Sequence, residues 1–375
     1  MSANEPRRAI HNFFMQRAIE LARRGWFTTR PNPRVGCVIT QGQVVRGEGC
    51  HERAGQPHAE VRALEDVRAR GGDAKGATAY VTLEPCSHRG RTEPCTKALI
   101  DAGIARVVVG AQDPNPVVDG QGIAQLREAG IEVVTGVLAD QCAALNLGFN
   151  KRMTAGRPWV RVKLAMSLDG RTAAADGSSQ WITGESARDD VHRLRAEAGA
   201  VLVGRGTIAA DDPSLNVRLP GDWAQPLRVV LDSELAMSPR AKMLTLDGPT
   251  LIATASDDAA RRRALEQAGA DIITMDRDTD GLDLAQVLAR LGERDINDLL
   301  VEAGPTLAGA LVRAGLVDEL VIYVAPMLIG DGGRALMALN GAVGLDDARA
   351  LVFDTVEPLG DDLRITARPA ARQPD

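Results

Sequence analysis

Residues 58–60 read HAE and residues 82–95 read TLEPCSHRGRTEPC, and these two stretches decide what the first half of the chain forms. His58, Cys86 and Cys95 supply three protein ligands for Zn²⁺ and leave the fourth tetrahedral position open to water. Glu60 stands at the start of an expected helix, where its carboxylate faces that water without ligating the metal and can take its proton. The pattern therefore predicts one catalytic zinc ion, held by His58, Cys86 and Cys95, with Glu60 as the catalytic residue.

The order H-x-E…P-C…C is typical of zinc deaminases, in which about two residues separate the cysteines. Here eight residues separate Cys86 from Cys95, so a loop has to bring Cys95 back to the metal. Taken singly, each ligand has an ordinary alternative as a helix-start histidine or a small buried residue. A fourth protein ligand would indicate a structural zinc module, but no other Cys or His is well placed, and the adjacency of Cys50 and His51 makes joint ligation awkward.

The composition indicates a folded protein with two domains. The chain has 375 residues, of which 45% are hydrophobic. Its net charge of −6 and its 3% aromatic residues argue against a nucleic-acid partner. Residues 1–155 hold 20 basic and 16 acidic residues (+4), whereas the remainder holds 24 and 34 (−10), which suggests two separately built halves.

Targeting signals are not evident in the sequence. The N-terminal stretch MSANEPRRAIHNFF has no apolar run of signal-peptide length, and no stretch is long enough to span a bilayer. Five cysteines in a long chain make a poor disulfide framework. We expect a cytoplasmic protein with reduced thiols and no membrane partner.

Hydrophobic periodicity predicts two α/β domains, residues 1–153 and 158–370, with a boundary at 154–158. The first is expected to have helices over 11–24, 58–70, 96–102, 120–129 and 138–153, and strands over 35–39, 43–47, 77–83, 106–110 and 131–135. In the second, the strands are expected at 160–165, 200–204, 227–232, 250–254, 271–274, 298–302, 317–325, 350–356 and 363–367. Its helices are expected at 185–196, 257–268, 282–291 and 305–314.

Five longer stretches of sequence indicate one particular family. They are QDPNP (112–116), KLAMSLDGRTA (163–173), SQWIT (179–183), ADDPSLNVR (210–218) and VEAGPTLAGAL (301–311). Together with the two opening stretches, they resemble the bifunctional deaminase–reductase family of riboflavin biosynthesis, in that family's order, from about residue 11 to residue 367. The resemblance implies an α/β chain with an N-terminal cytidine-deaminase-like domain and a C-terminal dihydrofolate-reductase-like domain.

The same resemblance implies two consecutive reactions on phosphorylated pyrimidines. The first is zinc-dependent hydrolytic deamination of 2,5-diamino-6-(5-phosphoribosylamino)pyrimidin-4-one, and the second is reduction of the product's ribosyl group to ribityl with NADPH. It also implies a homo-oligomer, a dimer or a tetramer. The main alternative is a nucleic-acid or nucleoside deaminase with an appended domain, which the acidic charge and the second-half blocks disfavour.

In the first half, the resemblance implies that Asn32, Asp113 and Asn115 contact the pyrimidine. Their side chains offer hydrogen-bonding groups for a polar ring edge. The alternative is that they form plain turns, since N-P and D-P dipeptides are common turn signals. His88, Arg89, Arg91 and Lys97 are further candidates for substrate or phosphate contact, with solvated surface positions as the alternative.

The second half has no G-x-G-x-x-G after a strand, so the usual dinucleotide fingerprint is absent. Two glycine turns at strand ends, at residues 204–207 and 304–307, suit one extended nucleotide across the sheet edge. By resemblance, the NADPH/NADP⁺ contacts are Ala165, Trp181, Thr207, Asp211, Ser233, Gly304, Pro305, Thr306, Leu307, Ala308, Gly309 and Ala310. The implied substrate contacts are Ser179, Arg195, Leu215, Arg218 and Glu302.

The roles of some residues in the second half stay open at this point. Arg205 is a candidate for the 2′-phosphate of NADPH, and Trp181 has a core position as its alternative. Lys163 and Asp169 lie in a matching block without an assignable role. His192 is expected on the surface of a polar helix, as is His11 in the first half.

Overall fold

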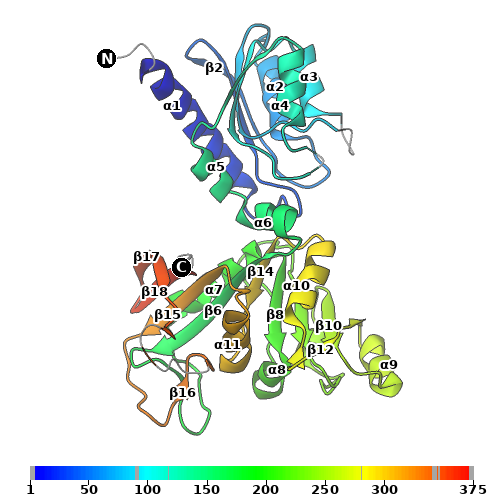
Figure 1. The fold of residues 1–375 in the computed structure, drawn as a ribbon, viewed down its shortest axis with the longest axis vertical. Coiled ribbons are helices and arrows are strands. Elements are labelled where there is room, and N and C mark those ends of the chain that lie inside the picture. The colour runs from blue at the N-terminus through cyan, green and yellow to red at the C-terminus, as the bar shows by residue number, and fades with distance from the viewer. Residues whose placement is uncertain are drawn as a thin grey trace. The chain divides into compact units, whose positions relative to one another are not determined.

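The computed structural model describes residues 5–88, 93–116, 118–279, 281–339, 344 and 347–370. The chain divides into two compact units, Met1–Gly156 and Arg157–Asp375. Each unit has its own β-sheet and its own helices (Figure 1). The α/β class predicted for both halves is confirmed.

A five-stranded mixed sheet forms the centre of the first unit. Its strands are β1 (Gly36–Gln41), β2 (Val44–Cys50), β3 (Thr78–Leu83), β4 (Arg106–Ala111) and β5 (Glu132–Thr135), in the order β2-β1-β3-β4-β5. Strand β1 is antiparallel to both neighbours, whereas β3, β4 and β5 are parallel. The helices are α1 (Glu5–Ala22), α2 (Ala59–Ala69), α3 (Cys95–Asp101), α4 (Gln121–Glu128), α5 (Ala139–Ala144) and α6 (Leu147–Ala155), with a 3₁₀ turn at Arg23–Gly25.

Alternate residues of β1 face two separate hydrophobic cores. Ile39 packs with Leu64 of α2 in one core, and Val38 packs with Ile19 of α1 in the other. Helix α2 approaches β2 so closely that a Cβ at Gly49 would lie 2.3 Å from the carbonyl oxygen of Ala59. Only glycine lets the two elements approach this closely.

A nine-stranded sheet forms the centre of the second unit. Its strands are β6 (Trp159–Ser167), β8 (Ala200–Gly204), β9 (Leu227–Leu231), β10 (Thr250–Thr254), β11 (Ala270–Thr274), β14 (Asp298–Val301), β15 (Glu319–Ala325), β17 (Leu351–Leu359) and β18 (Asp362–Pro369). The order is β11-β10-β9-β8-β14-β6-β15-β18-β17. Neighbours are parallel from β11 to β15, and β18 and β17 are added antiparallel.

Helices cover both faces of this sheet: α7 (Glu185–Glu197), α8 (Arg205–Asp211), α9 (Ala259–Gln267), α10 (Leu284–Glu293) and α11 (Pro305–Arg313). Leu288 of α10 and Leu311 of α11 pack in the core on one face, and Leu194 of α7 and Leu265 of α9 pack in the core on the other. Two further sheets have two short strands each. One joins β7 (Arg171–Ala173) and β16 (Arg334–Ala335), and the other joins β12 (Arg277–Asp278) and β13 (Gly281–Leu282). A 3₁₀ turn covers Lys242–Thr245.

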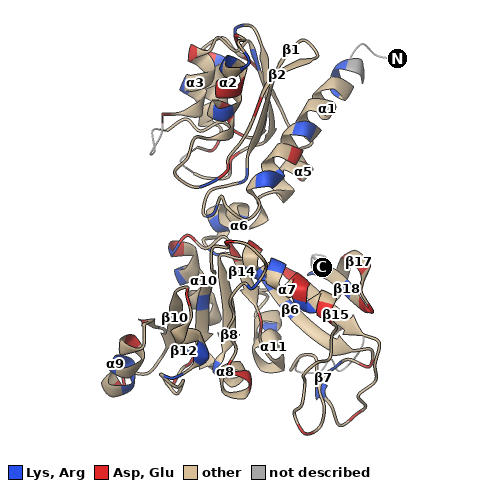
Figure 2. Ribbon diagram, turned by 180° about the vertical axis from the view of Figure 1, so that it is seen from behind, with Lys and Arg blue, Asp and Glu red and all other residues tan. Residues whose placement is uncertain are grey.

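Charge is mixed along the helices in the view of Figure 2, where α7 and α9 carry both basic and acidic residues. Within the described part of the chain, no helix combines the length and apolar character needed to cross a membrane.

Candidate active sites

The three predicted zinc ligands lie together in the first unit. Nδ1 of His58 is 3.3 Å from Sγ of Cys95 and 3.6 Å from Sγ of Cys86. His58 immediately precedes α2, Cys86 follows β3, and Cys95 begins α3. The backbone N–H of Cys95 donates to Sγ of Cys86 at 3.3 Å, so the intervening loop does return the second cysteine to the first.

This donor set fits zinc. Two ligands at Zn–N and Zn–S bond lengths on a tetrahedral ion are about 3.5 Å apart, which is close to both measured N···S distances. Hydrogen bonds from Cys95 and His58 lower the pKa of the Cys86 thiol, which favours the ionised form that a metal needs. Among the described residues, the cluster of possible metal ligands contains these three side chains alone, so zinc bound here keeps an open position.

Glu60 lies beside this cluster without belonging to it. It stands in the first turn of α2 and is 3% exposed. Burial is the main cause that raises the pKa of its carboxyl group to about 7, and the Cys86 charge adds to it. A carboxyl group with such a pKa can both accept and donate a proton near neutral pH.

Asn32 is held by a histidine next to the zinc ligands. Nδ2 of Asn32 lies 3.0 Å from Nε2 of His51, and Nδ1 of His51 lies 3.3 Å from the carbonyl oxygen of Pro57. When Nδ1–H donates to Pro57, Nε2 accepts from the Asn32 amide. The His51 ring packs edge-on against that of His58, with centroids 5.2 Å apart. Sequence reasoning missed His51, because no local pattern links it to Asn32, 19 residues away.

Glu84 organises the loop that carries Asp113 and Asn115. Its buried carboxylate accepts the backbone N–H groups of Asp113 at 3.2 Å, Gly120 at 3.1 Å and Ile123 at 3.1 Å. Oδ1 of Asp113 in turn accepts the N–H of Asn115 at 2.9 Å. Burial raises the pKa of Asp113 to about 6, and the charges of Glu84 and Cys86 add to this rise. Sequence reasoning also missed Glu84, whose signal is a carboxylate directly before Pro85-Cys86.

The other candidates for phosphate contact in this unit differ in their surroundings. Lys97 is exposed and forms an ion pair with Asp101 one turn along α3. His88 is exposed at the end of the described segment, and Arg89 and Arg91 lie outside the described residues.

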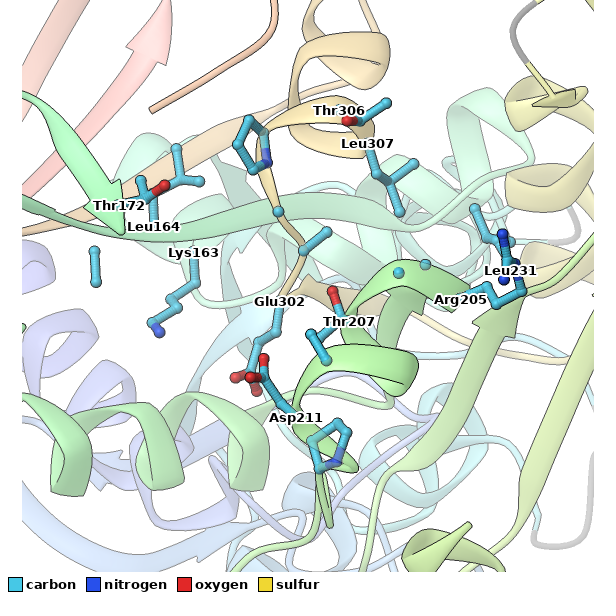
Figure 3. A pocket seen from close by; sticks show the side chains of 18 of the residues that line it. Lys163, Leu164, Thr172, Arg205, Thr207, Asp211, Leu231, Glu302, Thr306 and Leu307 are labelled. Atoms are coloured by element: carbon cyan, nitrogen blue, oxygen red, sulfur yellow. The ribbon is translucent and has the colours of Figure 1, made fainter. Parts of the chain in front are cut away.

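The second unit contains a cavity of about 1960 Å³. It opens where the parallel strands β6, β8, β9 and β14 end, which is where open α/β sheets bind ligands. In Figure 3, Lys163, Leu164 and Thr172 lie toward one side of the view and Arg205 and Leu231 toward the other, with Glu302, Asp211 and Thr207 between them.

Most residues predicted for the reductase half line this cavity. The five predicted substrate contacts all do: Ser179, Arg195, Leu215, Arg218 and Glu302. So do ten of the predicted NADPH contacts: Ala165, Trp181, Thr207, Asp211, Ser233, Gly304, Pro305, Thr306, Leu307 and Ala310. Ala308 and Gly309 do not. Ala308 is fully buried in the core, and a Cβ at Gly309 would lie 2.2 Å from the carbonyl oxygen of Ala338.

Trp181 is not a core residue, since 68% of it is exposed, and the guanidinium of Arg188 lies 4.9 Å from its ring centroid. The carboxylate of Asp169 makes hydrogen bonds within the protein. It accepts the hydroxyl of Ser167 at 2.5 Å and the backbone N–H groups of Ile329 and Gly330, which lowers its pKa to about 2. It does not line the cavity, and its hydrogen bonds to Ile329 and Gly330 hold the loop after β15.

Arg195 and Glu302 form a two-point ion pair, with Nε–Oε1 at 2.5 Å and Nη2–Oε2 at 2.9 Å. Burial opposes the charge of Glu302, but Arg195 outweighs it and lowers the pKa of the carboxyl group below its usual value. Lys163 lines the same end of the cavity, where burial lowers its pKa.

Two histidines are less exposed than the sequence suggested. His11 is half-buried, and its Nδ1 lies 3.2 Å from the hydroxyl of Tyr80. His192 is half-buried on α7 and lines the cavity. Its polar helical neighbours gave no sign of this, because the groups that it meets come from another loop.

Comparison with known proteins matches one family to each unit. The family described as the cytidine and deoxycytidylate deaminase zinc-binding region matches residues 8–111, and the family described as the RibD C-terminal domain matches residues 158–363. The riboflavin biosynthesis protein RibD of Escherichia coli (strain K12) is 47% identical, over 94% of this chain and 97% of that protein. The RibD of Haemophilus influenzae is 46% identical, over 95% of this chain and 96% of that protein.

Solved structures give the same result. RibD of Acinetobacter baumannii (form 1) superposes with a TM-score of 0.90 at 43% identity, covering 97% of this chain and all of that one. A diaminohydroxyphosphoribosylaminopyrimidine deaminase/5-amino-6-(5-phosphoribosylamino)uracil reductase of Thermotoga maritima superposes with a TM-score of 0.86 at 34% identity, covering 97% of this chain and all of that one. The chain therefore belongs to the RibD family of riboflavin biosynthesis proteins, and it is a bifunctional enzyme with a zinc-binding deaminase domain and an NADPH-dependent reductase domain.

Proposed function

We propose that the first unit hydrolyses the 2-amino group of 2,5-diamino-6-(5-phosphoribosylamino)pyrimidin-4-one and that the second reduces the resulting 5-amino-6-(5-phosphoribosylamino)uracil. In the first reaction, water adds to C2 of the ring and ammonia leaves. In the second, the C1′–O4′ bond of the ribose ring opens to an imine, hydride from NADPH adds to C1′, and protons from solvent complete O4′–H and the amine, which gives the ribityl chain. The observation that carries the proposal is the three-ligand cluster with Glu60 beside it, on the same chain as a large cavity at a parallel-sheet edge.

In the deaminase unit, His58, Cys86 and Cys95 would hold the metal. Zinc, when bound, lowers the pKa of water so that a nucleophile is available at neutral pH. Glu60 is proposed to take the proton of that water and to deliver it to the departing nitrogen, because its buried carboxyl group stands beside the ligands at the start of α2. Asn32, Asp113 and Asn115 are proposed to bind the pyrimidine edge, with His51 and Glu84 holding two of them in place.

In the reductase unit, the cavity would hold both reactants across the sheet edge. NADPH supplies the hydride. We assign its binding to the part of the cavity near Thr207, Ser233 and residues 304–307, and the substrate to the part near Arg195, Arg218 and Glu302. Alignment of donor and acceptor carbons and exclusion of water are the main contributions that hydride transfer asks of a protein.

The proposed domain bounds are residues 1–153 for the deaminase and 158–370 for the reductase. A cytoplasmic location is proposed as well, because thiols that ligate a catalytic metal have to stay reduced.

We further propose that the chain forms a homodimer through β17 and β18. Strand β17 lies at the end of the nine-stranded sheet. Four of its apolar residues are exposed, Leu351 at 42%, Val352 at 52%, Phe353 at 64% and Val356 at 55%. An exposed apolar edge strand invites pairing with another chain unless it is covered, and a second copy offers a self-complementary cover.

Light scattering after size exclusion tests this arrangement. The native chain is expected at the mass of a dimer, and Phe353→Asp with Val356→Asp at the mass of a monomer. Phe13→Asp is the matched control, because Phe13 is also exposed, at 70%, but lies on α1. A monomeric native chain, or a double variant that stays dimeric, would refute the proposed interface.

The activity is tested by incubating the zinc-loaded chain with the diaminopyrimidine, with and without NADPH. Ammonia is expected in both cases, and loss of NADPH absorbance only after deamination has begun. If no ammonia forms, the proposed substrate is wrong. If ammonia forms but NADPH is not consumed, the proposed second reaction is wrong.

A further inference from the structure

Trp181 presents an exposed aromatic ring to the reductase cavity. It lines the cavity, and 68% of its surface is accessible to solvent. Such a ring offers a surface on which a flat ligand ring can stack. An exposed side chain also loses rotamer freedom when a ligand orders it, and this loss weakens binding unless the side chain is ordered beforehand. The contribution of Trp181 to binding therefore depends on what holds its ring in place.

Arg188 of α7 contacts both this ring and the backbone that carries it. Its guanidinium carbon lies over the ring of Trp181, 4.9 Å from the ring centroid, which is within the range of a cation–π contact. Its Nη1 donates to the carbonyl oxygen of Thr183 at 2.9 Å. A planar guanidinium that is oriented by a hydrogen bond and stacked on a ring restrains the position of that ring.

The segment that carries Trp181 has a separate anchor at its end. Gly184 immediately precedes α7, and its backbone N–H donates to Oδ2 of Asp362 at 2.8 Å. Asp362 begins β18 and is 3% exposed, so this anchor is buried. The backbone at the end of the segment is thus attached to the sheet, whereas the contact that reaches the indole ring comes from Arg188.

The neighbours of Trp181 along the chain indicate which ligand ring it meets. Ser179, two residues earlier, is expected to contact the substrate, whereas Trp181 is expected to contact NADPH, and both line the cavity. Hydride transfer requires the nicotinamide end of NADPH to lie against the substrate. A cofactor contact next to a substrate contact is therefore expected at the nicotinamide, which is itself a flat ring.

We propose that Arg188 is a positioning residue, which holds the ring of Trp181 so that the ring can pack against the nicotinamide of NADPH. The proposal rests on the proposed reductase function and deepens it. Arg188 lies outside the stretches that carry the family resemblance, and no sequence pattern identified it. It acts through Trp181 and needs no contact of its own with the reacting atoms.

A double-mutant cycle on NADPH affinity tests this role. Arg188→Met keeps an unbranched side chain but removes the guanidinium, and with it both contacts. Calorimetry with the full chain and NADPH, without the pyrimidine, gives each Kd. We expect Arg188→Met to weaken NADPH binding roughly tenfold in the native background, and less than about twofold in Trp181→Leu, which itself binds roughly tenfold more weakly than the native chain.

Three results of the cycle would overturn the proposal. They are native affinity in Arg188→Met, native affinity in Trp181→Leu, and an equal loss from Arg188→Met in both backgrounds, which would show that Arg188 does not act through the ring. Arg193→Met is the matched control with native affinity expected, because Arg193 is exposed on the same helix and does not line the cavity. A tenfold loss in the control would assign the effect to the helix and would equally overturn the proposal.

Fluorescence anisotropy reports the position of the ring directly. The chain has four tryptophans, so the emission of Trp181 is the difference between a chain that has it and the same chain with Trp181→Leu. We expect this difference emission to have a lower anisotropy in Arg188→Met than with Arg188 in place, because the ring is released. Unchanged anisotropy would refute the positioning role, whatever the affinity for NADPH.

A shorter ligand separates this test from the proposed function. Adenosine 2′,5′-bisphosphate has the adenosine end of NADPH but no nicotinamide, so Arg188→Met and the native chain are expected to bind it equally. An equal loss of affinity for both ligands would overturn the assignment to the nicotinamide. If the native chain binds NADPH but does not reduce the aminouracil, the proposed second reaction fails, while the cycle still decides the role of Arg188.

Discussion

Glu60 shows how burial prepares a single carboxyl group for proton transfer. Its side chain is almost fully enclosed at the start of α2, and its pKa is raised to about 7. Glu60→Gln removes the titrating group but keeps the shape and leaves the three ligands intact. We expect the variant to hold a full equivalent of zinc while ammonia release falls roughly 10²–10⁴-fold.

Elemental analysis and an ammonia assay on the same sample check this prediction. Glu65→Gln is the matched control, because Glu65 is exposed on the same helix. Undiminished ammonia release by Glu60→Gln would show that another group moves the proton.

The two cysteines make a second prediction at the scale of single residues. Cys86→Ser and Cys95→Ser each replace a thiolate with a hydroxyl that stays protonated, and three protein ligands become two. We expect either variant to lose most of its zinc and its deamination, measured by elemental analysis after dialysis. Cys142→Ser should keep the metal, since Cys142 is buried in the separate core that contains α1. Native zinc content in Cys86→Ser or Cys95→Ser would contradict the ligand set.

At the scale of elements, periodicity located most helices and strands because their signals are local. The strand expected at 200–204 is β8 with the same bounds, and the helix expected over 257–268 is α9 at 259–267. One difference has a non-local cause. The helix expected over 138–153 is broken into α5 and α6, and at the break the side-chain amide of Asn146 bonds to both backbone groups of Arg34, 112 residues away. Another difference has a local cause, because helix α8 is only seven residues long, too short for a 3.6-residue period to stand out.

The same distinction separates the site residues that sequence reasoning found from those that it missed. His58, Glu60 and the two cysteines belong to one spaced pattern. His51 contacts the side chain of Asn32, and Glu84 accepts the backbone N–H of Asp113. His192 lines the cavity and contacts the backbone N–H of Arg218. A sequence pattern reports neighbours along the chain, so contacts that the fold creates between distant segments had to come from the structure.

Glu84 yields a prediction for the loop between β4 and α4. Its carboxylate accepts the backbone N–H groups of Asp113 and Gly120 in that loop and of Ile123 in α4. Each one loses its acceptor in Glu84→Ala, at a cost of about 1–3 kcal/mol per buried group. Because the loop carries Asp113 and Asn115, we expect a raised deaminase KM with zinc retained. Glu84→Gln keeps one acceptor oxygen and should recover part of the affinity, as steady-state kinetics can show. Unchanged KM in Glu84→Ala would contradict the positioning role.

On the scale of the whole molecule, each set of described site residues lies within one compact unit. The zinc cluster, Glu60 and Asp113 belong to Met1–Gly156, and the described lining of the large cavity belongs to Arg157–Asp375. We expect neither reaction to need a side chain from the other unit. A change in one unit should therefore abolish one reaction and leave the other at its native rate.

This independence leads to a complementation experiment with two inactive full-length variants. Glu60→Gln is expected to reduce the aminouracil but not to form it, and Glu302→Gln to form it but not to reduce it, since Glu302 lines the proposed substrate end and balances Arg195. Neither alone should make the ribityl product from the diaminopyrimidine and NADPH. An equimolar mixture should make it after a lag that shortens as enzyme concentration rises, because the intermediate crosses through solvent.

Chromatography of the product gives the rate, and the aminouracil added directly to Glu60→Gln is the control for an intact reductase. If both single controls behave as expected and the mixture still makes no product, the intermediate has to stay within one chain, and the two units depend on each other in a way that their separate sites do not reveal.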